Sequence, residues 1–153
     1  MFKSSSVFPA LMILVLLALV MPNVINLIKG PAETPGVFDE HYTLTQASGL
    51  SADTGKPMLV LVTADWCPPC QTLKRNTMTD PSVIDWIQSN TIPVYLEDGE
   101  NGQEIGSLPV SAYPTTLLIQ DGQVLASLQG AAGAREFINK LSSKLSSAMI
   151  TDP

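Results

Sequence analysis

The stretch TADWCPPCQT, residues 63–72, contains both cysteines of this 153-residue chain, Cys67 and Cys70. Their spacing fits a structural staple, half of a metal site, or a dithiol that is oxidised and reduced in use. A staple would close a loop of only two residues, which constrains little of the unfolded chain. A zinc site would need two further ligands, and His41 is the chain's single histidine. The pattern therefore favours an active dithiol.

The neighbouring residues predict that the dithiol lies between a strand and a helix. Met58–Thr63 is a continuous apolar run, which is typical of a strand covered on both faces. Pro68 and Pro69 suit the first positions of a helix, where a missing N–H costs little, and the helix is expected to continue over Cys70–Met78. Cys67 then lies at the helix N-terminus, where free N–H groups and the helix dipole favour its thiolate.

This placement assigns different roles to the two sulfurs. The Cys67 thiolate is expected to attack a substrate disulfide and form a mixed disulfide with it. Cys70 lies one helical turn along the same face, so it can displace the product and close the small disulfide. The sequence thus predicts thiol–disulfide exchange with Cys67 as nucleophile and Cys70 as resolving partner.

The rest of the chain after the N-terminal segment alternates strand and helix signals and predicts one α/β sheet. The expected elements are a short edge strand over Val37–Tyr42, a weak helix over Thr43–Asp53, a helix from Asp80–Pro81 to about Ser89, a strand over Thr91–Leu96, a helical turn near Gln103–Ile105, strands over Thr115–Ile119 and Val124–Leu128 joined by a hairpin, and a last helix over Ala134–Leu145.

The order and spacing of four features resemble the thioredoxin-fold family. They are the apolar strand leading into Ala64–Cys70, Tyr113-Pro114-Thr115 before a strand, Asp121-Gly122 in the hairpin, and Gly130 before the last helix. The resemblance covers residues 37–145 and implies a thioredoxin-like fold, a central mixed sheet flanked by helices. The context Thr-Ala-Asp-Trp-Cys is similar to that of periplasm-facing reductase domains.

The resemblance also implies a substrate groove beside the dithiol. In the family, the proline at Pro114 is cis, and the backbone of Tyr113 pairs with an extended substrate segment. Trp66 is expected to form part of the docking surface. The family uses the cysteine pair itself, so we expect no cofactor other than the Cys67–Cys70 disulfide and no metal.

One departure concerns proton transfer to the resolving cysteine. Thioredoxins carry a buried aspartate six residues before the first cysteine, and Leu61 occupies that place here. The base that assists Cys70 is then either water or another group. Glu97, on the neighbouring predicted strand, is a candidate.

Composition limits the class of partner. From Pro31 onward the sequence has 14 acidic and six basic residues, and the basic residues form no stripe. This composition argues against nucleic-acid binding. Val7–Ile28 has no charged residue and follows a head with the single Lys3, which favours an uncleaved signal anchor over a cleaved peptide. The expected parts are a transmembrane helix over 1–29, a linker over 30–36, a thioredoxin-like domain over 37–148 on the periplasmic side, and a tail over 149–153.

The residues around Cys67 favour a reductase. Strong oxidants of this fold carry a histidine between the cysteines, whereas Pro68 and Pro69 lack even an N–H to donate to the thiolate. Asp65 adds a negative charge nearby, so we expect the pKa of Cys67 to be lowered less than in the oxidants. A reductase outside the cytoplasm implies disulfide-containing protein substrates and a membrane protein that supplies electrons. A disulfide oxidase or isomerase, or a redox-inert binding module on a membrane stalk, is the alternative.

Overall fold

The computed structural model describes residues 7–28 and 30–151. The chain divides into two compact units, Met1–Pro31 and Ala32–Pro153. The first unit contains α1 (Val7–Ile28), on which the large apolar side chains between Leu11 and Met21 are exposed.

None of the helices in residues 7–28 and 30–151 is both long enough and apolar enough to cross a membrane. Residues 1–6 and 29 of the expected anchor, and residues 152–153 of the expected tail, lie outside the described residues.

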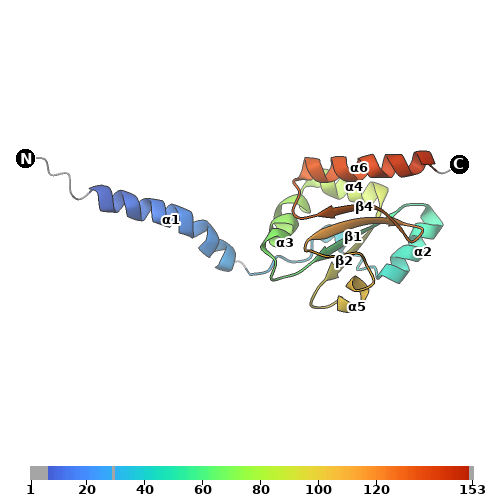
Figure 1. Cartoon of the computed structure of the whole chain (residues 1–153), viewed down its shortest axis with the longest axis horizontal. Helices are drawn as coiled ribbons and strands as arrows, with labels where there is room; N and C mark the ends of the chain where they lie inside the picture. The colour runs from blue at the N-terminus through green and yellow to red at the C-terminus, as the bar shows by residue number, and fades with distance from the viewer. Residues whose placement is uncertain (1–6, 29, 152–153) are drawn as a thin grey trace, which may run out of the picture. The chain divides into compact units, whose positions relative to one another are not determined.

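The second unit is a mixed sheet with helices on both faces (Figure 1). The strands lie in the order β2-β1-β3-β4, with β1 and β2 parallel and the other neighbours antiparallel. Along the chain the elements are η1 (Gly36–Phe38), α2 (Leu44–Thr54), β1 (Met58–Thr63), α3 (Pro68–Thr72), η2 (Leu73–Thr77), α4 (Pro81–Asn90), β2 (Ile92–Glu97), α5 (Gly102–Ile105), β3 (Thr115–Gln120), β4 (Gln123–Gln129) and α6 (Ala134–Thr151).

Strand β1 is buried along its whole length because its two faces pack into different cores. Leu59 and Leu61 belong to the core under η1, α4 and α6, whereas Val60 and Val62 belong to the core under α2 and α5. In Figure 1, α4 and α6 accordingly lie on one side of the sheet and α2 and α5 on the other. The run Met58–Thr63 is thus continuously apolar because helices cover both faces of the sheet at β1, as the sequence predicted.

Most predicted elements begin within one residue of their observed start. The hairpin between β3 and β4 turns at Asp121 and Gly122, whose φ angles of 51° and 74° are those of a two-residue turn with both residues left-handed. Helix α6 continues beyond the predicted end to Thr151.

The predicted edge strand over Val37–Tyr42 is wrong. The segment forms the 3-10 helix η1, in which the N–H of Phe38 donates to the Pro35 carbonyl at 2.9 Å. Val37 and Phe38 are both buried, although consecutive strand residues point to opposite faces. A short helical turn lets both side chains enter the same core.

The predicted single helix after the cysteines is interrupted. Helix α3 ends at Thr72, and the next turn, η2, is a π-helix in which the N–H of Met78 donates to the Leu73 carbonyl at 3.0 Å. Such widened turns are rare in proteins, and those that occur are often found at functional sites. Here the wide turn buries Lys74, whose side chain is only 2% exposed.

Candidate functional site

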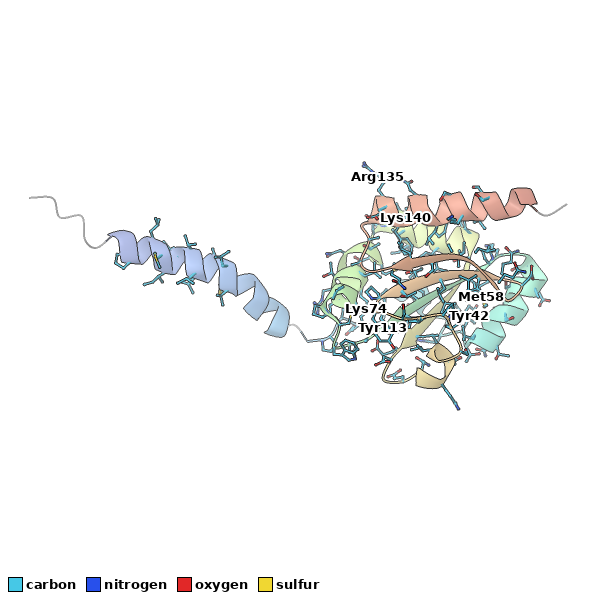
Figure 2. All side chains as sticks on the ribbon, viewed as in Figure 1. Tyr42, Met58, Lys74, Tyr113, Arg135 and Lys140 are labelled. Atoms are coloured by element: carbon cyan, nitrogen blue, oxygen red, sulfur yellow. A yellow bond between two sulfur atoms is a disulfide. The ribbon has the colours of Figure 1, made fainter. Side chains whose placement is uncertain are left out.

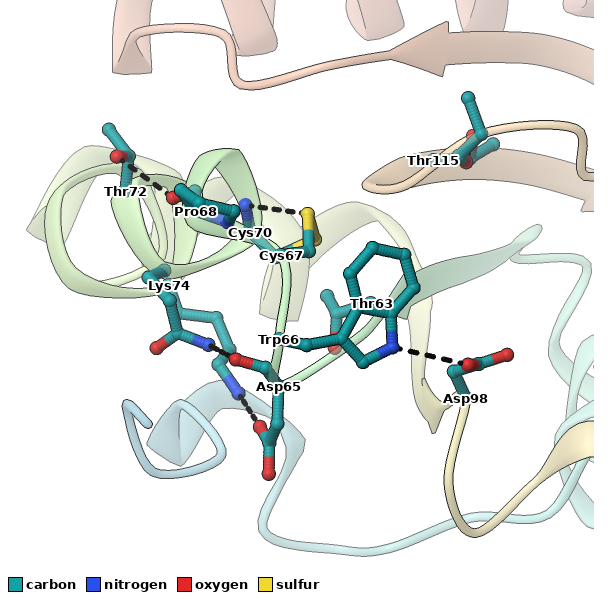
Figure 3. Close-up of a disulfide and its surroundings, with 12 residues drawn as sticks. Thr63, Asp65, Trp66, Cys67, Pro68, Cys70, Thr72, Lys74, Asp98 and Thr115 are labelled. Carbon is teal, nitrogen blue, oxygen red and sulfur yellow. Dashed lines mark hydrogen bonds and ion pairs between the residues drawn. A yellow bond between two sulfur atoms is a disulfide. The ribbon is translucent and has the colours of Figure 1, made fainter. Parts of the chain in front are cut away.

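Cys67 caps the helix that carries Cys70. Its backbone is extended, Pro68 and Pro69 occupy the first helical positions, and its sulfur accepts a hydrogen bond from the Cys70 N–H at 3.2 Å. The two sulfurs form a disulfide, as Figure 3 shows. An N–H of the first helical turn therefore points at the Cys67 sulfur, which is the arrangement that stabilises a thiolate.

The dithiol lies in a small cluster of buried side chains, next to two aromatic rings, Trp66 and Tyr113, that form an aromatic rim. Cys67 is 3% exposed and Cys70 is fully buried, and both pack with Ala64 and the side chain of Tyr113. Trp66 is 71% exposed, which is unusual for a tryptophan.

Asp98 holds the two aromatic rings of this rim. Its Oδ1 accepts a hydrogen bond from the hydroxyl of Tyr113, a residue labelled in Figure 2, at 2.5 Å. Its Oδ2 accepts a hydrogen bond from the Trp66 indole N–H at 3.4 Å, as Figure 3 shows. The rings of Trp66 and Tyr113 meet edge to face with centroids 5.8 Å apart. A single carboxylate thus fixes the orientation of both rings.

We expect the contact with Asp98 to be visible in the titration of Tyr113. The hydrogen bond to Asp98 raises the pKa of Tyr113 above its usual 10.0, and desolvation and the Asp98 charge act in the same direction. Asp98→Asn removes the charge, so the pKa of Tyr113 should fall toward 10.0. The interaction with the neutral phenol persists up to pH 10 and is lost as pH rises through the folded-state pKa.

An alkaline absorbance titration of wild type and Asp98→Asn measures this shift, with Tyr113→Phe identifying the step that belongs to Tyr113. An unchanged titration in Asp98→Asn would show that the carboxylate does not hold the phenol.

A group of charged and hydroxyl side chains adjoins the dithiol turn. Thr63, Lys74 and Glu97 are buried, Tyr95 is half-buried, and Asp65 is exposed at the edge of the group. We call these five residues the buried charge cluster. Lys74 Nζ donates to Asp65 Oδ1 at 3.1 Å and to the Tyr95 hydroxyl at 3.0 Å. Glu97 Oε2 accepts from the hydroxyls of Thr63 and Tyr95, at 2.8 and 3.1 Å. Glu97 Oε1 accepts the backbone N–H of Asp65 at 2.6 Å.

The ionised form of Lys74 is stabilised in this cluster despite its burial. Desolvation lowers the pKa of Lys74, but its hydrogen bond to Tyr95 and its ion pair with Asp65 outweigh that effect, so the pKa is raised above 10.5. Lys74 is therefore a buried cation at neutral pH. The sequence reasoning counted Asp65 as a free negative charge, whereas the structure pairs it with Lys74.

The structure brings most of the predicted site residues together. Trp66 and Tyr113 meet beside the cysteines, and the Tyr113–Pro114 peptide is cis, as the resemblance implied. Pro68 and Pro69 are exposed on the outer side of the turn. Leu61, in the place of the family's buried aspartate, is an ordinary core residue.

The sequence did not indicate the burial of Lys74 or the contacts of Asp98, and it suggested Glu97 only as a candidate base. A signal for Glu97 and Asp98 was present, because they directly follow the predicted strand Thr91–Leu96, as Thr63 ends the predicted strand Met58–Thr63. Since β1 and β2 are parallel, with Thr63 opposite Glu97, these ends meet at one edge of the sheet. No comparable signal existed for Lys74, because its burial depends on the π-helical turn.

Comparisons with known proteins agree with this geometry. A family model described as Thioredoxin-like matches residues 40–120. The thiol:disulfide interchange protein DsbD 1 of Pseudomonas aeruginosa is 39% identical over 57 residues, which are 35% of this chain. The match covers 10% of that protein's length.

Two solved structures share the fold. A thioredoxin from Thermus thermophilus superposes with a TM-score of 0.59 at 22% identity, covering 67% of this chain and 83% of that protein. The oxidised C-terminal domain of DsbD from Neisseria meningitidis superposes with a TM-score of 0.57 at 18% identity, covering 65% of this chain and 90% of that domain. With a family match over more than half of its length and a Cys67–Cys70 disulfide at the start of α3, this chain belongs to the thioredoxin-like family.

Proposed function

We propose that this chain is a thiol–disulfide oxidoreductase that reduces disulfides in other proteins. The observation that carries the proposal is the Cys67 sulfur at the N-terminus of α3, with the Cys70 N–H 3.2 Å away and the exposed Trp66 beside it. This arrangement supplies a stabilised thiolate, a second thiol one turn away, and a surface on which a protein partner can dock.

The exchange begins from the reduced dithiol. The Cys67 thiolate attacks one sulfur of the substrate disulfide, forming a mixed disulfide and releasing the other substrate sulfur as a thiolate, which takes up a proton. The Cys70 thiol loses its proton and attacks the Cys67 sulfur. The Cys67–Cys70 disulfide forms, the second substrate sulfur leaves, and two electrons have passed to the substrate.

The surface beside the dithiol suits an extended protein segment. Tyr113 packs against the cysteines, its hydroxyl donates to Asp98, and the cis Pro114 follows it in the chain. Trp66 offers a large apolar face next to the reacting sulfur. We therefore propose disulfide-containing proteins, whose backbone can pair along Tyr113, as the substrates.

The proposed direction of electron flow is supported by the small number of N–H donors near Cys67. Pro68 and Pro69 occupy the two positions before Cys70 and have no N–H to donate. A thiolate with fewer donors makes the reduced form less stable, which lowers the reduction potential. We propose a reductase on this ground.

The test is equilibration of the full chain against glutathione buffers of graded ratio, with the oxidised fraction read by thiol alkylation and mass. The expected midpoint lies nearer to about −270 mV, as in thioredoxin, than to about −120 mV, as in the strong oxidant DsbA. A midpoint above about −180 mV, in the range of isomerases and oxidants, would reverse the proposed direction.

We further propose that the thioredoxin-like unit works on the extracytoplasmic side of the cytoplasmic membrane, tethered by the N-terminal segment and recharged by a membrane electron-donor protein. The support is the uncharged sequence Val7–Ile28 and the exposed apolar side chains between Leu11 and Met21. Fractionation of cells that express the full chain tests the tether. Recovery in the soluble fraction, with a mature N-terminus between Met21 and Glu33, would show cleavage instead.

A further inference from the structure

The buried charge cluster takes no part in the sulfur exchange steps themselves, although it contacts the dithiol turn at both ends. Before the turn, Glu97 binds the Asp65 N–H, and Asp65 precedes Cys67 by two residues. After the turn, Lys74 lies four residues beyond Cys70 and returns to Asp65. Figure 3 shows the Lys74–Asp65 contact beside the cysteines.

The residue after the disulfide makes the same connection. Gln71 follows Cys70 directly, and its side-chain amide donates to the Asp65 carbonyl at 3.1 Å. Its side-chain oxygen accepts the Ala32 N–H. Asp65 is therefore bound by three side chains, those of Glu97, Gln71 and Lys74, which connect the residues before the disulfide to those after it.

Glu97 joins the end of β2 to the turn that precedes the dithiol. One of its carboxylate oxygens accepts the Asp65 N–H, and the other accepts the hydroxyls of Thr63 and Tyr95. The carboxylate is therefore held in one position relative to this turn.

The formal charges of the cluster sum to one negative charge, from the cation of Lys74 and the carboxylates of Asp65 and Glu97. Lys74 and Glu97 are buried, so water and salt screen them less than surface charges. The Cα atoms of Asp65 and Cys67 are at most roughly 7 Å apart, since two peptide units join them. The cluster is therefore attached to the backbone next to the dithiol, and charged groups near a thiol change the stability of its thiolate.

We propose that the buried charge cluster sets the redox equilibrium of the dithiol, with Glu97 and Asp65 shifting it toward reducing power and Lys74 shifting it toward oxidising power. The inference rests on the proposed function and names the residues that regulate it. Glu97 and Lys74 act through electrostatics on Cys67 and are positioning residues. They do not touch the substrate disulfide.

The reaction that reports this equilibrium is balanced. Two glutathione thiols give up two electrons and two protons and become glutathione disulfide, while the Cys67–Cys70 bond breaks and each sulfur returns to the thiol or thiolate form. A more negative cluster destabilises the Cys67 thiolate and shifts this equilibrium toward the protein disulfide.

The experiment compares two neutral replacements of similar size in the full chain. Lys74→Met leaves two carboxylates, so its equilibrium constant for reduction by glutathione should fall by about threefold to tenfold. Glu97→Gln leaves a neutral pair, so the constant should rise by a similar factor. Thiolate absorbance as a function of pH should show the pKa of Cys67 raised in Lys74→Met and lowered in Glu97→Gln.

The two variants are expected to shift the equilibrium constant in opposite directions. This separates an electrostatic effect from damage to the fold, because loss of packing would shift the constant of both variants in the same direction. Lys74→Arg should restore the wild-type equilibrium to within about twofold. Asp65→Asn provides a variant that the fold tolerates, since the Asp65 side chain is 54% exposed, and it should shift in the same direction as Glu97→Gln.

The matched control is Lys56→Met, which removes a lysine at the opposite end of β1. Lys56 precedes Thr63 by seven residues, which is roughly 20 Å along a strand. The equilibrium constant of Lys56→Met for reduction by glutathione should stay within about twofold of the wild-type value. A shift as large as that of Lys74→Met would assign the effect to total charge and overturn the proposal.

Shifts of the same sign in Lys74→Met and Glu97→Gln, or no shift in either, would also overturn it. These results are distinguishable from a failure of the proposed function. In that case the wild-type disulfide itself would not exchange with glutathione, and both proposals would fall together.

Discussion

Replacing Cys67 with serine is expected to lower disulfide exchange by at least roughly a thousandfold, to the background rate. A serine hydroxyl is not ionised at neutral pH and cannot form the mixed disulfide. Cys70→Ser should behave differently, because the attacking thiolate is retained and only the second step is blocked. This variant should accumulate a covalent adduct with its substrate protein.

The measurement is non-reducing electrophoresis of the two single variants after exposure to an extract, followed by mass spectrometry of the adducts. The adduct should join Cys67 to a partner cysteine and disappear on reduction. The double variant without either cysteine is the control and should form no adduct. If adducts formed on Cys67→Ser but not on Cys70→Ser, Cys70 would be the nucleophile and Cys67 the resolving cysteine.

Phe38→Ala is expected to destabilise the thioredoxin-like unit by about 3–5 kcal/mol. Phe38 is 1% exposed in the core under η1, and its ring lies 5.7 Å from that of Tyr95. Truncation removes this contact and leaves a cavity. Because domains of this size are stable by only about 5–15 kcal/mol, the melting temperature should fall by roughly 10 °C or more.

Urea unfolding of the full chain, followed by tryptophan fluorescence, measures this loss. Val124→Ala is the control, since Val124 is 41% exposed on β4 and its truncation should cost less than about 0.5 kcal/mol. If Phe38→Ala costs no more than this control, the segment around η1 is not part of the folded unit.

The elements that the sequence predicted well are those whose signals are local. The apolar run of β1, the proline pair at the start of α3 and the Asp121–Gly122 turn each act over a few residues. The two cysteines carry their chemistry in their spacing, so the centre of the site followed from the same stretch. A resemblance based on motif order supplied the cis peptide at Pro114.

The elements that the sequence missed depend on contacts between distant segments. Phe38 forms a helical turn because its ring meets Tyr95, 57 residues later in the chain. Asp98 controls the aromatic rim because β2 ends beside β1, and that register is set by packing over the whole sheet. The sequence around Lys74 gives no sign of a buried cation, so Lys74 would be expected to be exposed to solvent like most lysines.

The π-helical turn η2 makes this site sensitive to the length of the chain as well as to its composition. A π-turn contains one residue more than an α-turn, and each residue of an α-helix advances by about 100°. If Asn76, an exposed residue of η2, were deleted, the turn would close to a regular helix. Either Lys74 or the following Thr77 and Met78 would then rotate out of the core. A homologue with the same lysine but one residue fewer would therefore lose either the buried cation or the core contacts of Thr77 and Met78, and an alignment by residue identity alone would not reveal the difference.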